Sequence, residues 1–274
     1  MLALGLALGL HDAFGHVAPL LKGTGCQARA RGQDFHLAVG QAGIAATIAG
    51  VAQRRAMPDR AVTIAYAAAL QESKLQNLPY GDRDSVGIFQ QRPSQGWGPT
   101  WRLEQPVYAS TKFFAALAAV PHYRSMPVYQ AAQAVQHSAD GSAYGQYAYP
   151  AAILARAFTG RAAHAVWCWY GTGNTGPATW RSAQLSAAAR ELRRTFGRQD
   201  MITTGDPVLV VRVRRARDGW AEAAWLVTHA GAYGIREVRC AGLQWSAASG
   251  RRGWIAQRAG RRAAPPPRGT VVLG

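Results

Sequence analysis

Ala68-Ala-Leu-Gln-Glu72-Ser73 and Gly87-Ile-Phe-Gln-Gln91 are the two segments on which the fold assignment depends. Pro58 suits the first position of a helix, because its missing amide hydrogen is one that a helix start leaves unpaired anyway. Apolar residues then recur at three- and four-residue steps and define a core-facing stripe. Glu72 continues this stripe, so we expect its carboxyl group to leave the helix on the buried side. The stripe consists of Val62, Ala65, Tyr66 and Ala69.

The position of Glu72 favours proton-transfer chemistry. Burial and the negative end of the helix dipole both disfavour the charged form of a carboxyl group. A protonated carboxyl group can donate its proton to the leaving oxygen of a glycosidic bond. The alternative is a solvated Glu72 at the end of a surface helix, since Glu is rarely fully buried.

A polar turn separates Glu72 from a second apolar element. Residues 77–85 are rich in turn-forming residues, and the chain becomes apolar again at Val86. Gly87 permits close backbone approach, while Gln90 and Gln91 offer paired donors and acceptors. These amides suit the hydroxyl and N-acetyl groups of a sugar.

Together, Glu72-Ser73, the turn and Gly87-Ile-Phe-Gln90 resemble the first two motifs of lysozyme-like lytic transglycosylases, over roughly residues 40–158. The resemblance implies a single catalytic residue, Glu72, that acts first as acid and then as base without a cofactor. It also implies a role in orienting this acid or lining the sugar groove for six residues. These are Ser73, Gly87, Phe89, Gln90, Gln91 and Gln136.

The third motif of that family, an Ala-Tyr-Asn-Ala-Gly-like element, has a distorted counterpart in Ala134-Val-Gln-His-Ser138. Gln136 stands at the position of the family's Asn, and Val135 replaces the aromatic residue. This departure leaves an alternative open, a non-catalytic protein of the same fold that binds wall polymer or an envelope partner. Residues 60–98 resemble more closely a group of uncharacterised actinobacterial envelope proteins.

A second carboxylate would distinguish a hydrolase from a transglycosylase, since most glycoside hydrolases use a pair. Asp82 and Asp84 are the nearest candidates. The alternative for both is a polar turn in which Arg83 pairs locally, in keeping with the turn preference of Asp. The loop matches no EF-hand pattern, and no metal site is predicted.

Charge indicates the kind of partner. The chain has 31 Lys and Arg against 14 Asp and Glu, a formal net charge of +17. Such a surface attracts polyanions, and we expect peptidoglycan strands or another anionic wall polymer. Nucleic-acid binding is not expected, because no zinc-finger spacing, RNP-like aromatic run or basic recognition helix accompanies the charge.

The N-terminal segment and the cysteines bear on location. Residues 1–25 contain an apolar run from Leu2 to Leu10 that suits a truncated export signal or a membrane anchor, although nine residues cannot span a bilayer. We therefore expect an extracytoplasmic protein of the cell envelope; the alternative is a buried helix of a cytosolic protein. Among three cysteines, we expect a Cys26–Cys168 bridge that fastens the two ends of one domain, or else three reduced thiols.

The fold class expected is a mainly α lysozyme-like domain followed by a small α+β module. Helices are predicted over 41–55, 58–72, 106–120, 127–136 and 142–158. The predicted organisation is a helical domain at 26–168, a linker and helix at 169–198, an α+β module at 199–258 and a disordered tail at 259–274. Several aromatic residues between positions 97 and 149 suit either a sugar groove or core packing. They are Trp97, Trp101, Tyr144, Tyr147 and Tyr149.

Overall fold

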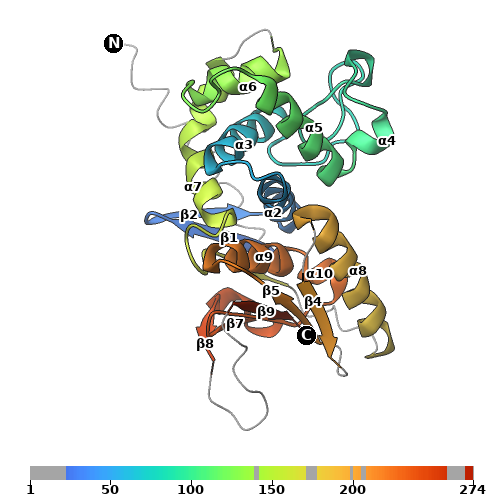
Figure 1. Ribbon diagram of the computed structural model, residues 1–274, viewed down its shortest axis with the longest axis vertical. Helices are drawn as coiled ribbons and strands as arrows, with labels where there is room; N and C mark the ends of the chain where they lie inside the picture. The colour runs from blue at the N-terminus through green and yellow to red at the C-terminus, as the bar shows by residue number, and fades with distance from the viewer. Residues whose placement is uncertain are drawn as a thin grey trace.

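The computed structural model describes residues 23–138, 142–170, 178–197, 200–204, 208–257 and 269–273 (Figure 1). The fold is mixed α+β, with most of the helices preceding the larger of two antiparallel sheets. Most of the predicted N-terminal segment, residues 171–177 of the linker and residues 259–268 of the predicted tail lie outside this description. Among the described residues, no helix has both the length and the hydrophobicity needed to cross a bilayer.

The helical part confirms the helices that periodicity predicts. It consists of α2 (Val39–Arg54), α3 (Asp59–Ser73), α4 (Thr100–Leu103), α5 (Pro106–Ala119), α6 (Val128–Gln136) and α7 (Ala148–Phe158). Short 3₁₀ helices, η2 (Pro93–Gln95) and η3 (Ser142–Tyr147), lie between them. The prediction for 142–158 therefore needs a correction, since its first six residues form η3 rather than α-helix.

Helix α2 is the centre of the molecule and packs against α3, α5, α7, α8 (Ala178–Phe196) and α9 (Ala216–Thr228). Small residues make this close packing possible. A Cβ atom on Gly50 would lie 2.5 Å from Thr195 and 2.8 Å from Phe196 of α8. The Ala- and Gly-rich composition of α2 thus serves close helix packing.

A small sheet joins the beginning and the end of the helical part. Strand β1 (Gly25–Ala30) pairs with β2 (Gln33–Leu37) and with β3 (Val166–Trp169). Cys26 lies opposite Cys168 in the β1–β3 ladder, and the two are joined by a disulfide bond. The predicted bridge is confirmed, and Cys240 is the buried free thiol.

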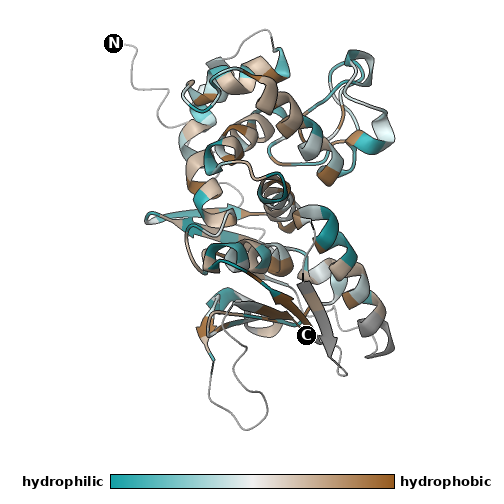
Figure 2. Ribbon diagram, viewed as in Figure 1, coloured by the Kyte–Doolittle hydropathy of each residue, from teal (hydrophilic) through white to brown (hydrophobic). Residues whose placement is uncertain are grey.

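A six-stranded antiparallel sheet follows, in the order β4-β5-β9-β6-β7-β8. Its central strand β9 (Thr270–Leu273) pairs with β5 and β6, so the predicted disorder of the tail is wrong for these residues. The pattern Thr-Val-Val-Leu supplies the apolar, β-branched residues that a central strand requires, and Figure 2 shows its partner β5 as hydrophobic. The other strands are β4 (Asp200–Thr204), β5 (Val208–Arg212), β6 (Glu237–Cys240), β7 (Leu243–Ser246) and β8 (Ile255–Ala256).

The larger sheet, α9 and the short α10 (Ala230–Tyr233) share one continuous core with the helical part. Indole nitrogens of Trp245 and Trp254 donate to the carbonyls of Cys168 and Val166, at 2.9 and 2.8 Å. The α9 helix lies between this sheet and α2 (Figure 1). The C-terminal part is therefore docked on the helical part through β3, α2 and α9.

Candidate functional site

The end of α3 carries the residues that the sequence singles out. Glu72 is half-buried and Ser73 is buried at 4 % exposure. The chain then leaves the helix through two consecutive left-handed residues, Lys74 at φ 55° and Leu75 at φ 59°. Non-glycine residues pay a steric cost in this region, and such conformations are concentrated at functional sites.

The carboxylate of Glu72 accepts a hydrogen bond from a buried tyrosine. The phenol of Tyr144, on η3, donates a hydrogen bond of 2.6 Å to Oε1 of Glu72. Tyr144 is 1 % exposed. Burial and, next, the hydrogen bond to Glu72 raise the pKa of Tyr144 well above its usual range, so the phenol keeps its proton and remains a donor.

The predicted second motif forms a tight loop beside this carboxylate's helix. Val86 and Gln91 pair as an isolated antiparallel bridge that closes the loop. Gly87 has φ 80°, and a Cβ atom there would lie 2.6 Å from the carbonyl oxygen of Leu103. The close approach predicted for Gly87 is therefore required by the fold.

Two side chains tie the loop to the helices on either side. Ser73 donates to the carbonyl of Ile88 at 2.8 Å, from the end of α3. Gln136 donates through Nε2 to the carbonyl of Phe89 at 2.7 Å, from the end of α6. Ser73 and Gln136 thus meet at the 87–90 loop, and Glu72 directly precedes Ser73 at the end of α3.

The remaining predicted groove residues contact the loop itself or the neighbouring helix α5. Gln90 has φ 47° and donates to the carbonyls of Gly87 at 3.1 Å and Tyr80 at 3.3 Å. Phe89 is fully buried, with its ring stacked on that of Phe113 at a centroid distance of 4.3 Å. Gln91 is 2 % exposed, and its Nε2 donates to the carbonyl of Ala109 on α5 at 3.5 Å, so its side chain contacts α5.

The two aspartates lie in different settings. Asp84 accepts hydrogen bonds from Arg92 at 2.8 Å and from the backbone and hydroxyl of Ser94 at 2.7 and 3.0 Å. Arg92, followed by the two Ser94 donors, lowers the pKa of Asp84 well below its usual range. Asp82 has a 91 % exposed side chain, with Arg83 at 3.9 Å. Asp84 therefore secures the start of η2.

Aromatic residues around the site divide into two groups. Tyr144 and Tyr147 are buried, and Tyr147 accepts a hydrogen bond from the ammonium group of Lys74. Large exposed aromatic surface is instead offered by Tyr80, Trp101 and Tyr149. The direct contact of Tyr144 with Glu72 was not predicted, because 72 positions separate these residues in the chain.

The described residues contain no group of three or more His, Cys, Asp or Glu side chains that could hold a metal ion. Comparison with known proteins adds no assignment, since the chain matches no protein family and no curated protein.

Proposed function

We propose that this protein cleaves cell-wall glycan as a peptidoglycan lytic transglycosylase, in a lysozyme-like helical domain with Glu72 as its single acid and base. The observation that carries the proposal is the Glu72 carboxylate at the end of α3, held by Tyr144 and placed beside a loop that Ser73 and Gln136 clamp. A positioned carboxyl group that remains accessible is what general acid catalysis requires.

The reaction follows from the chemistry of one carboxyl group. Protonated Glu72 gives its proton to the glycosidic oxygen between N-acetylmuramic acid and N-acetylglucosamine, and the bond from C1 to that oxygen breaks. The resulting carboxylate takes the proton of the muramic C6 hydroxyl, whose oxygen bonds to C1. The product is a 1,6-anhydromuramyl end, and Glu72 regains its starting state.

Internal displacement is favoured over hydrolysis by the state of the nearby aspartates. Asp84 already accepts three hydrogen bonds, and Asp82 is almost fully exposed. A hydrolase of the common type needs a second carboxylate that is free to act on water or on the sugar.

An extracytoplasmic location in the cell envelope belongs to the same proposal. Disulfide bonds form and persist in oxidising compartments, and Cys26 and Cys168 are bonded. The formal net charge of +17 favours anionic wall polymer as the partner. Anchoring through residues 1–25 remains a prediction.

Digestion of purified peptidoglycan, with mass analysis of the fragments, tests the proposal. Wild type is expected to release anhydromuramyl ends, and Glu72→Gln to release none. Glu191→Gln, a matched change on α8 where Glu191 pairs with Arg194 at 3.0 Å, is expected to leave cleavage unchanged. Ordinary reducing ends from wild type would identify a hydrolase. Binding of the polymer without any cleavage would contradict the proposal and support the alternative, a non-catalytic protein that binds wall polymer.

A further inference from the structure

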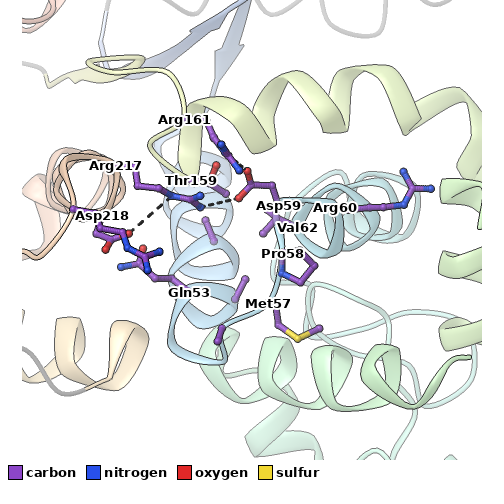
Figure 3. Close-up of a pocket in the computed structure, with 14 residues that line it drawn as sticks. Gln53, Met57, Pro58, Asp59, Arg60, Val62, Thr159, Arg161, Arg217 and Asp218 are labelled. Atoms are coloured by element: carbon purple, nitrogen blue, oxygen red, sulfur yellow. Dashed lines mark hydrogen bonds and ion pairs between the residues drawn. The ribbon is translucent and has the colours of Figure 1, made fainter. Parts of the chain in front are cut away.

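A pocket of about 550 Å³ lies at the end of α3 opposite Glu72 (Figure 3). Fifteen helical residues at 1.5 Å each place the two ends about 20 Å apart. The pocket is formed where the end of α2, the start of α3, the turn after α7 and the start of α9 meet. It is therefore separate from the candidate catalytic site.

The pocket has an apolar floor and a charged wall. Ala49, Ala52 and Val62 of α2 and α3 are buried and form part of the floor. The wall carries charged side chains from the α7 turn and α9. A volume of about 550 Å³ falls in the range of sites for small organic ligands and exceeds what a bare ion fills.

One carboxylate holds two guanidinium groups of the wall in place. Asp59, the first residue of α3, accepts a hydrogen bond from Arg161 on one oxygen and from Arg217, at 2.8 Å, on the other. This arrangement offsets the repulsion between the two arginines and sets their orientation. Because each guanidinium has five N–H donors, both keep donors for a further partner.

The wall also has unused hydrogen-bonding capacity. The Nε atom of Arg217 is buried without a hydrogen-bond partner in the described structure, and Oδ1 of Asp218 is 4.0 Å away. Arg215 also lines the pocket and has an exposed side chain. Three arginines, Arg161, Arg215 and Arg217, thus face two carboxylates. Arg60 lines the pocket as well, but its guanidinium turns away to the carbonyl of Met126.

Two helices add positive potential at the same place. Helices α3 and α9, of 15 and 13 residues, both begin at the pocket. Their N-cap residues, Pro58 and Arg215, make no side-chain cap hydrogen bond. Backbone N–H groups at a helix start attract anions, and phosphate above all.

From these observations we propose that the pocket binds an organic phosphate. A phosphate monoester has three terminal oxygens and more negative charge than a carboxylate, so it can accept hydrogen bonds from Arg161, Arg215 and Arg217 together. The organic part lies on the apolar floor. Binding is independent of Glu72 and joins the helical part to α9 through the ligand.

Calorimetric titration of the full chain at low salt, with phenyl phosphate, inorganic phosphate and benzoate as probes, tests the proposal. Phenyl phosphate is expected to bind most tightly. Arg215→Gln is expected to weaken it about 10-fold, the effect of losing one charged hydrogen bond. Arg161→Gln is expected to act similarly, since Asp59 remains paired with Arg217 and melting curves report the fold. The control is Arg31→Gln, an exposed arginine in the β1–β2 turn.

Each other outcome overturns a stated part of the proposal. Unchanged affinity in both pocket variants would rule out the site. An equal loss in Arg31→Gln would indicate attraction by overall charge alone. Equal or tighter binding of benzoate would remove the assignment to phosphate. Equal affinity for inorganic phosphate and phenyl phosphate would contradict the assignment of an organic group to the apolar floor.

Discussion

The phenol oxygen of Tyr144 lies 2.6 Å from Oε1 of Glu72, a contact that joins η3 to the last turn of α3. This hydrogen bond orients the carboxylate of the half-buried Glu72, while Tyr144 itself is buried. An acid that acts on a sugar needs this combination of access and fixed orientation.

Tyr144→Phe removes this hydrogen bond while keeping the buried ring. We expect glycan cleavage to slow about 10- to 100-fold, because a hydrogen bond to a charged group contributes about 1.5–3 kcal/mol. Release of muropeptides from purified peptidoglycan measures the rate. Tyr233→Phe, which removes a tyrosine hydroxyl on α10 of the C-terminal part, serves as the control. Equal rates in wild type and Tyr144→Phe would show that the contact does not position Glu72.

Gly87→Ala and Gly96→Ala separate backbone strain from steric conflict, since both glycines have φ 80°. An added Cβ meets nothing within 4 Å at Gly96, but lies 2.6 Å from the Leu103 carbonyl oxygen at Gly87. We expect Gly96→Ala to cost about 1–2 kcal/mol through strain alone. Gly87→Ala should cost about 1–3 kcal/mol more and displace the loop. Urea denaturation measures both, and equal midpoints would contradict the close packing.

Two buried groups give opposite pH dependences of stability. Burial and, less strongly, the charge of Asp218 raise the pKa of Glu222 from 4.5 to about 8. In this range folded Glu222 keeps a proton that the unfolded chain releases. Its contribution to the free energy of unfolding therefore falls as the pH rises from 4.5 to 8. Burial lowers the pKa of His229 from 6.5 to about 4, so its contribution rises with pH over that window.

These contributions oppose each other between pH 4.5 and 6.5, and that of Glu222 remains alone from 6.5 to 8. In wild type we expect the free energy of unfolding to fall by about 2 kcal/mol between pH 6.5 and 8 because of Glu222. In Glu222→Gln this fall should be absent. Between pH 4.5 and 6.5 the free energy of unfolding of the same variant should rise with pH, because the contribution of His229 is no longer opposed by Glu222. Urea denaturation across pH measures the difference from wild type, with Glu191→Gln as the matched control. An unchanged slope between pH 6.5 and 8 would exclude Glu222 as its source.

The Cys26–Cys168 bond spans 142 positions of the chain. We expect its loss in a Cys26→Ser, Cys168→Ser double variant to lower the free energy of unfolding by about 2–5 kcal/mol. Denaturation in the absence of reductant measures this loss, and wild type with reductant should approach the variant. In the unfolded, non-reduced wild type, one thiol is expected to titrate; three would contradict the bridge.

Much of the helical part was predictable from sequence, because a helix repeats its contacts within a few residues. The stripe from Val62 to Ala69 predicts α3 and places Glu72 at its end. The turn formers and Gly87 predict the loop that follows. Phe113, Phe114 and Leu117 share one face of α5, at positions i, i+1 and i+4, and lie fully buried.

The strands show where local pattern is insufficient. Strand β9 takes its place only through pairing with β5 and β6, and its four residues follow a stretch rich in Arg, Ala and Pro. Likewise β1 meets β3 about 140 positions later, with Cys26 opposite Cys168. A short strand is stable only when its ladder is complete, and the ladder partners are distant in sequence.

By itself, the sequence determined the helices, the place of Glu72 at the end of α3 and the glycine that the next loop requires, because these depend on local periodicity and turn chemistry. The cysteine pair was an expectation that the β1–β3 ladder decided, since it places Cys26 opposite Cys168. Tertiary structure alone decided that Tyr144 holds Glu72, that Gln136 reaches the carbonyl of Phe89, and that Asp59 gathers Arg161 and Arg217 beside the pocket. Hydrogen bonds between distant segments form only after the chain has packed, and their direction is set by the helices that carry them.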